Sequence, residues 1–180
     1  MMRADGFARG AVFAALAAAA WLPWMVVLGG GRAAFALYLV AITAAYLVGL
    51  GPRGAPRLAV AAGAALLGGV LAAGVHTPGE LALGLGAILA TARGAVLHRA
   101  RPARAIVTEV VLVGGGLLFA RALAAPTAFG VMLAVWGFFL VQSTFFLVAG
   151  VEPRPAATAR RDPFEEAYAR ATALLEDEGV

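Results

Sequence analysis

The sequence contains no cysteine, lysine or asparagine, and each absence excludes a class of site. Without cysteine there is no disulfide, thiolate metal site or cysteine nucleophile, and without lysine there is no Schiff base. Without asparagine there is no N-glycosylation acceptor. Charged residues make up only 13% of the 180 residues, whereas 62% are hydrophobic. A water-soluble domain carries about 25% charged residues, so lipid is the expected solvent for most of this chain.

The net positive charge comes from one part of the sequence. Residues 1–151 carry ten arginines against three acidic residues, a net charge of +7, whereas residues 152–180 have a net charge of −3. The basic residues flank long apolar runs, which indicates membrane topology rather than nucleic-acid binding. A composition rich in alanine, glycine and arginine without lysine is typical of a bacterial gene of high GC content.

Long apolar runs predict six transmembrane helices, since each run is close to the ~20 residues that a helix needs to cross the hydrocarbon layer. Their approximate ranges are 11–30, 33–51, 58–75, 81–97, 105–124 and 127–150. The first run is too long for the apolar region of a signal peptide, so we expect an uncleaved helix. Pro23 should bend it, because proline removes one backbone hydrogen bond.

The arginines predict how these helices are oriented, because short positively charged loops stay on the cytoplasmic side. Six helices with both termini inside place Arg53, Arg57 and the segment from 98 to 104 in the cytoplasm, and leave only Arg32 and Arg121 near the outer side. The basic loop of that segment consists of His98, Arg99, Arg101 and Arg104. The predicted fold is therefore an all-α protein of a bacterial inner membrane, with both termini cytoplasmic.

The residues at the predicted helix surfaces suggest how the helices pack. Small residues recur every four positions in 61–73 and in 82–94, which favours close helix contacts and predicts that the third and fourth helices are buried in the bundle. The sixth helix carries bulky aromatic residues that we expect to face lipid or a partner protein. These are Phe129, Trp136, Phe138, Phe139, Phe145 and Phe146.

The last thirty residues differ from the rest. Residues 152–162 read as a linker, and 163–178 predict a cytoplasmic amphipathic helix with Asp162 as its N-cap. The apolar face predicted for docking consists of Phe164, Tyr168, Ala171, Leu174 and Leu175. So short a helix is marginal alone in water, and the cytoplasmic loops, the bilayer surface and a partner protein remain alternative docking sites.

Charged residues inside membrane helices are functional candidates because their burial is costly. Arg93 and Glu109 lie four or five residues from the basic loop, so they reach the same depth in two antiparallel helices. Glu80 and Arg121 lie at a common depth near the outer ends of the same two helices. Three alternative roles remain for Arg93 and Glu109. Arg93 could extend to the cytoplasmic interface while Glu109 bonds to the basic loop, the two could form a structural ion pair, or they could form a proton- or substrate-binding site. Glu80 and Arg93 are thirteen residues apart, so both cannot point straight at the fifth helix.

Gln142, Ser143 and Thr144 form the compact polar cluster of the sixth helix. We expect them to bond across helices or to their own backbone, with a solute site as the alternative. The two histidines fall on opposite sides of the predicted membrane, so we expect no metal site and no cofactor. The sequence contains no hydrolase elbow, phosphate loop or dinucleotide fingerprint, and Ser143 has no histidine or lysine at its level to act as a base.

These features predict a non-enzymatic protein, an accessory or scaffolding subunit of a larger membrane complex. Its partner would bind through the sixth helix or the C-terminal helix. The alternative is a small-solute transporter component with a substrate site among the helices. In size and topology alone the chain is similar to the substrate-binding subunits of vitamin importers, but it carries no motif of that family.

Overall fold

The computed structural model describes residues 2–50, 55–97 and 102–148, with side chains placed for 5–49, 58–93 and 106–147. Every regular element in these segments is an α-helix, so the prediction of an all-α fold is confirmed for them. The helices are α1 (Met2–Leu28), α2 (Arg32–Leu50), α3 (Ala55–Gly74), α4 (Pro78–Leu97), α5 (Pro102–Leu123), α6 (Ala128–Ser143) and α7 (Phe145–Val148). Each predicted apolar run contains one long helix, although α1 begins earlier than expected and the sixth run is divided at Thr144.

Several predictions concern residues beyond this part of the chain. The linker, the amphipathic helix and its docking face lie outside the described residues, as do His98, Arg99 and Arg101. Arg104 lies in the first turn of α5, but its side chain is not among those placed.

Four helical segments are long and apolar enough to cross a membrane: Asp5–Leu28, Arg32–Gly49, Ile106–Leu123 and Ala128–Leu147. A fifth segment, Leu58–Gly74, is apolar but shorter. The length and composition of the first four segments match the requirement for a transmembrane helix. The described part of the chain is therefore consistent with an α-helical membrane protein.

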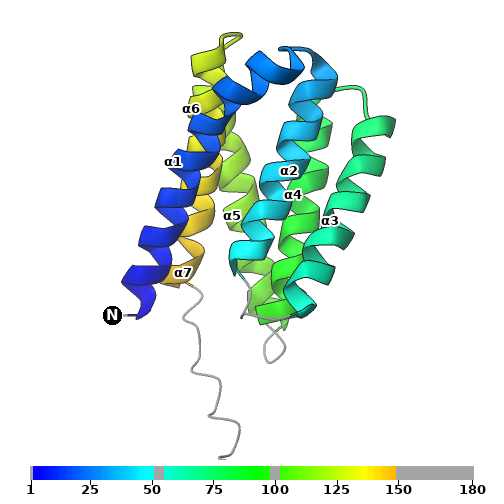
Figure 1. The fold of residues 1–180 in the computed structure, drawn as a ribbon. Coiled ribbons are helices and arrows are strands. Elements are labelled where there is room, and N and C mark those ends of the chain that lie inside the picture. The colour runs from blue at the N-terminus through cyan, green and yellow to red at the C-terminus, as the bar shows by residue number, and fades with distance from the viewer. Residues whose placement is uncertain (1, 51–54, 98–101, 149–180) are drawn as a thin grey trace, which may run out of the picture. The chain divides into compact units, whose positions relative to one another are not determined.

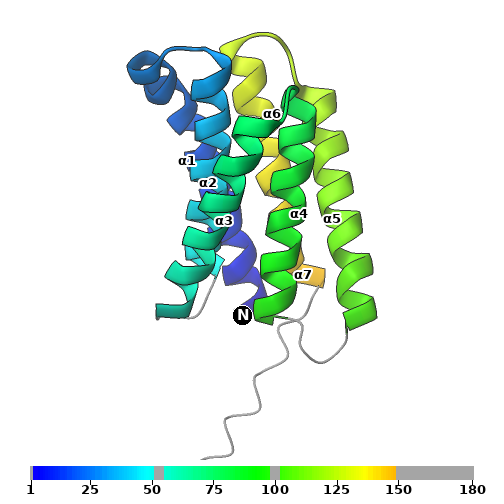
Figure 2. The ribbon, with the colours of Figure 1, turned by 90° about the vertical axis from the view of Figure 1, so that its right-hand side faces the viewer.

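Five of the six long helices of the described residues form a ring, and α3 lies outside it. α6 packs between α1 and α5, α4 contacts both α5 and α2, and α2 contacts α1, which completes the ring. α3 packs on the outside of this ring against α2 and α4 (Figure 1, Figure 2). Figure 1 also shows the last turns of α1, which include Pro23, turning toward the start of α2.

The two ends of the bundle differ in sequence. At one end α1, α3 and α5 begin and α2, α4 and α6 end, and the first turns of α3 and α5 there contain Arg57 and Arg104 (Figure 1). We call this the basic end. The opposite end is formed by the short turns at residues 29–31, 75–77 and 124–127, and we call it the turn end.

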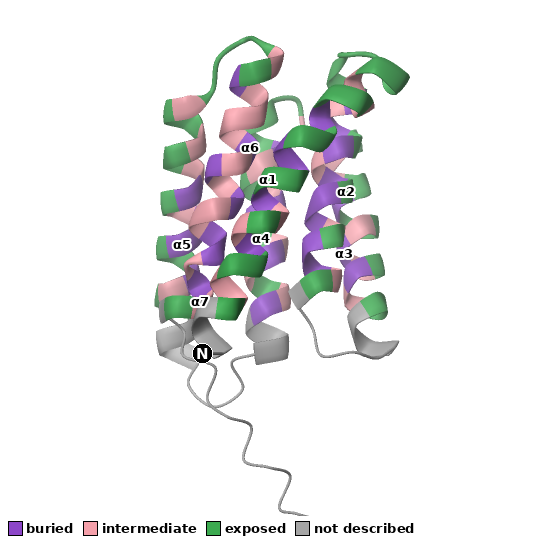
Figure 3. Ribbon diagram, turned by 60° about the vertical axis from the view of Figure 1, so that its left-hand side comes forward, coloured by how far each residue is buried: buried purple, intermediate pink, exposed green. Residues whose placement is uncertain are grey.

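A large hydrophobic cluster lies between α1, α2 and α6. The rings of Phe13, Tyr46 and Phe139 contact one another pairwise with centroids 5.2 Å apart. Trp21 and Tyr38 extend this cluster toward the turn end, and the Tyr38 hydroxyl donates to the carbonyl of Ala17. The buried positions accordingly follow the facing sides of these helices (Figure 3).

Two predictions about helix surfaces were wrong. Phe139 and Phe145 of the sixth run are buried, with 2% and 1% of their surface exposed, because α1 and α5 cover α6 from two sides. Phe129, by contrast, is 65% exposed.

The prediction that α3 is buried was also wrong, whereas α4 lies within the bundle through Leu81, Leu85 and Leu89. α3 contacts its neighbours through Ala61 and Ala64, whereas the later members of its four-residue repeat, Gly69 and Ala73, are exposed. At 3.6 residues per turn a four-residue step drifts by about 40°, so the repeat does not remain on one face.

Candidate functional site

Arg93 of α4 and Glu109 of α5 form an ion pair inside the bundle. The Arg93 Nη2 atom lies 2.5 Å from Glu109 Oε2, and the two side chains are 0% and 6% exposed. Both residues lie in the half of the bundle toward the basic end, since Arg93 is near the end of α4 and Glu109 near the start of α5. The antiparallel helices therefore bring them to one level, and Arg93 turns inward rather than toward the interface.

Gln142 of α6 joins this pair to a third helix. Arg93 Nη2 also donates to Gln142 Oε1 at 2.6 Å, and Gln142 Nε2 donates to the backbone carbonyl of Leu112 in α5 at 2.9 Å. Gly116 makes room for the amide, because a Cβ atom at this position would lie 2.8 Å from Gln142 Nε2. We call Arg93, Glu109 and Gln142 the buried cluster.

Two aromatic residues enclose the buried cluster. The ring of Phe145 in α7 has its centroid 5.0 Å from the Arg93 Cζ atom, a distance suited to a cation–π contact. The Tyr46 hydroxyl of α2 donates to the Gln142 carbonyl at 3.4 Å, which is a long and weak bond. The cluster thus takes contacts from α2, α4, α5, α6 and α7.

The other two members of the predicted polar cluster bond to their own helix. Ser143 Oγ donates to the Leu140 carbonyl at 2.6 Å, and Thr144 Oγ1 donates to the Val141 carbonyl at 2.7 Å. These local bonds occur where α6 ends and α7 begins. Of the three neighbouring polar residues, only Gln142 reaches another helix through its side chain.

The buried cluster retains unused hydrogen-bonding capacity. Arg93 Nε, Arg93 Nη1 and Glu109 Oε1 are buried and have no partner among the described residues. A buried charged group with unpaired atoms carries a desolvation cost that its ion pair offsets only in part. This cost makes Arg93 and Glu109 the candidate functional residues with the strongest physical basis.

Glu80 and Arg121 are not brought together. The Glu80 carboxylate accepts from the backbone N–H groups of His76 and Thr77, at 3.2 and 3.1 Å, and Thr77 Oγ1 accepts from the Glu80 N–H at 3.2 Å. These reciprocal bonds form a capping box at the start of α4. The bonds from Thr77 and then His76 hold the pKa of the exposed Glu80 carboxyl below its ordinary value of 4.5. Arg121 lies exposed in the last turn of α5.

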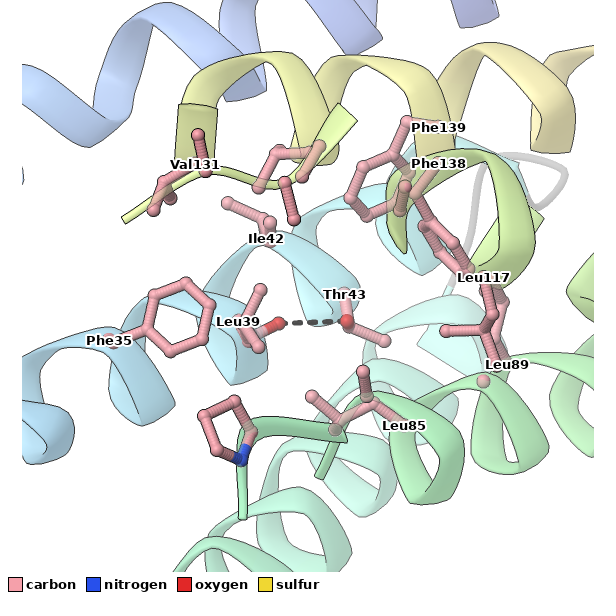
Figure 4. Close-up of a pocket in the computed structure, with 18 residues that line it drawn as sticks. Phe35, Leu39, Ile42, Thr43, Leu85, Leu89, Leu117, Val131, Phe138 and Phe139 are labelled. Carbon is pink, nitrogen blue, oxygen red and sulfur yellow. Dashed lines mark hydrogen bonds between the residues drawn. The ribbon is translucent and has the colours of Figure 1, made fainter. Parts of the chain in front are cut away.

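A cavity of about 170 Å³ lies between α2, α4, α5 and α6. Its lining is almost entirely apolar, and the hydroxyl of Thr43 donates to the Leu39 carbonyl at 2.8 Å rather than into the space (Figure 4). The labelled side chains of Figure 4 converge from all four helices. The lining comprises Phe35, Leu39, Ile42, Thr43, Pro78, Ala82, Leu85, Gly86, Leu89, Leu117, Ala120, Ala124, Ala125, Val131, Ala134, Val135, Phe138 and Phe139.

The cavity has an open end and a closed end. Its exposed lining residues, Pro78, Ala124 and Ala125, all belong to the turn end. Leu89 and Phe139 are buried and lie about one helical turn before Arg93 and Gln142 on α4 and α6. An apolar floor therefore separates the cavity from the buried cluster.

The sequence contained signals for some of these features and not for others. The run from Thr77 to Glu80, with Pro78 at the first helical position, is the signature of a capping box and identifies the partner of Glu80. Tyr46 had no such signal, because a tyrosine near the end of an apolar run is equally typical of an interfacial anchor. The cavity had none either, since it depends on how side chains from four helices fill space.

Comparisons of the chain with protein-family models, curated proteins and solved structures found no match. Among the described residues, no three histidine, aspartate or glutamate side chains gather as metal ligands would.

Proposed function

We propose that this chain is a non-enzymatic polytopic membrane protein that serves as an accessory or scaffolding subunit of a larger membrane complex. The observation that supports this most strongly is the enclosure of the buried cluster. Arg93, Glu109 and Gln142 direct their charged and amide groups at one another and at the backbone of α5. Such an arrangement joins α4, α5 and α6 and leaves these groups out of reach of the cavity.

The proposed partner site is the C-terminal helix predicted over 163–178, with the sixth helix in second place. α6 is covered by α1 and α5, and Phe129 and Leu147 are the large apolar side chains of described α6 and α7 that are strongly exposed. The predicted tail helix has an apolar face and a net negative charge, which suits docking to a basic or apolar protein surface.

Co-purification tests the subunit proposal. The full-length chain is captured from native membranes after chemical cross-linking, and bound proteins are identified by mass spectrometry. The variant Leu174→Glu should lose a specific partner that the matched variant Ala173→Glu, on the opposite face of the predicted helix, retains. A monomer that repeatedly co-purifies with no protein would contradict the proposal.

For the membrane topology we propose six spans in a bacterial inner membrane with both termini cytoplasmic. The support is that the arginine-rich connections all join helix ends at the basic end. The chain lacks cysteine, so single cysteines introduced as Gly30→Cys and Ala100→Cys are the sole thiols. An impermeant maleimide added to intact cells should label the first and not the second, and the opposite pattern would refute the orientation.

The observation that bears on the alternative of a small-solute transporter component is the cavity. Its apolar lining gives no support for a polar solute, because transport of such a solute needs several convergent polar groups. The same apolar lining does support the binding of an apolar ligand.

A further inference from the structure

We infer that the cavity binds the hydrocarbon chain of a single-chain anionic amphiphile, of the fatty-acid type, which enters from the turn end. This inference does not depend on the subunit proposal. It rests on the chemistry of the lining, the shape of the space and the charges at its open end.

The lining excludes water as a stable occupant. A buried water needs two to four polar partners, and apolar cavities of about 150 Å³ remain dry and take up apolar molecules instead. This cavity measures about 170 Å³, and the hydroxyl of Thr43 is already bonded to the Leu39 carbonyl. The favoured occupant is therefore a hydrocarbon group.

The shape favours a chain over a compact ring. On α2 the lining extends from Phe35 to Thr43 and on α6 from Val131 to Phe139. Each of these stretches covers about 12 Å at ~1.5 Å per residue. A volume of about 170 Å³ distributed over such a length is narrow and elongated. An extended hydrocarbon tail matches it, with its end against the floor at Leu89 and Phe139.

The open end supplies positive charge. Arg32 begins α2 one turn before Phe35, and Arg121 lies in the last turn of α5 between the lining residues Ala120 and Ala124. Both arginines are exposed, and Arg32 donates to the carbonyl of Val75, just after α3. The one carboxylate at this end among the described residues, Glu80, is held by the backbone N–H groups of His76 and Thr77, so the two arginines leave a net positive charge there. A carboxylate or comparable anionic head at the turn end would meet these two cations while its tail remains in the cavity.

Photolabelling of the full-length protein in detergent micelles tests the inference. The probe is a fatty acid with a diazirine near the end of its tail, and the labelled peptides are identified by mass spectrometry. Labels, located to single residues by tandem mass spectrometry, should concentrate on Leu89, Leu117 or Phe138. The variant Ala120→Phe places a ring in the cavity and should reduce labelling by about tenfold. The matched variant Ala122→Phe, on the exposed side of the same helix, should not.

Two further comparisons make the result decisive. The double variant Arg32→Gln/Arg121→Gln should weaken labelling by the fatty acid more than labelling by the corresponding fatty alcohol. Equal labelling in the Ala120→Phe and Ala122→Phe variants would overturn the inference, as would labels concentrated on outward residues such as Leu66 and Leu118. Labelling by a two-chain phospholipid probe but not by the fatty acid would also overturn it.

Discussion

Replacing Glu109 with glutamine should destabilise the bundle far more than an ordinary polar substitution in a membrane protein. The change leaves the shape of the side chain almost intact but removes the negative charge 2.5 Å from the Arg93 guanidinium. Arg93 is 0% exposed, so its charge cannot turn to water without opening the contacts of α4, α5 and α6. The amide oxygens of the new glutamine and of Gln142 could still accept hydrogen bonds from the guanidinium, but neither carries the negative charge that balances it.

The expected cost is large because one charge would be left uncompensated. Removing one partner of a buried ion pair typically costs about 3–5 kcal/mol. Neutral hydrogen bonds between membrane helices average only about 0.6 kcal/mol. The double variant Arg93→Met/Glu109→Gln should recover most of the loss, because no buried charge remains unpaired.

Reversible unfolding in mixed micelles measures these free energies for the wild type, both single variants and the double variant. The coupling energy of this cycle isolates the ion pair from the other contacts of each residue. Arg121→Gln serves as the control, since Arg121 is an exposed charge on the same helix as Glu109. The reasoning is refuted if Glu109→Gln costs less than about 1 kcal/mol, or if the two single losses simply add.

Three smaller predictions follow from other contacts. Because the pKa of the Glu80 carboxyl is held below 4.5, its stabilisation of the start of α4 is present above that pH and is lost as the pH falls through the lower folded-state value. The protection factor of the Thr77 amide, which is the intrinsic exchange rate at each pH divided by the observed rate, should therefore fall in acid, and Thr77→Ala should weaken this dependence. Gly10→Val should disrupt the packing of α1 on α6, because a Cβ there would lie 2.5 Å from a side-chain carbon of α6, whereas Gly114→Val enters open space. A comparable loss of thermal stability in both glycine variants would contradict this. Tyr46→Phe should cost no more than about 1 kcal/mol, because its bond is long at 3.4 Å, and a larger loss in micelle unfolding would show that the hydroxyl has a stronger role.

The sequence was most informative where a single physical effect dominates. Long apolar runs reflect the thickness of a bilayer, so the locations of the long helices could be predicted from them. Counting residues from the basic loop also placed Arg93 and Glu109 at one level, because two antiparallel helices advance by the same rise per residue.

The sequence was least informative where one side chain has possible partners on several helices. Glu80 bonds to its own first turn instead of reaching Arg121, since a local capping box orders fewer groups than a contact between helices. The choice of Gln142 over Ser143 as the bridge depends on side-chain length and on the space at Gly116. The outer position of α3 and the existence of the cavity depend on the full three-dimensional packing.

The bridge through Gln142 has a consequence for the connection between α4 and α5. The alignment of these two helices is held by side-chain bonds deep in the bundle, to each other and to α6. The alignment of α4 with α5 therefore does not depend on the residues that link them. We expect a change in the length of this connection to leave the bonds between α4, α5 and α6 intact.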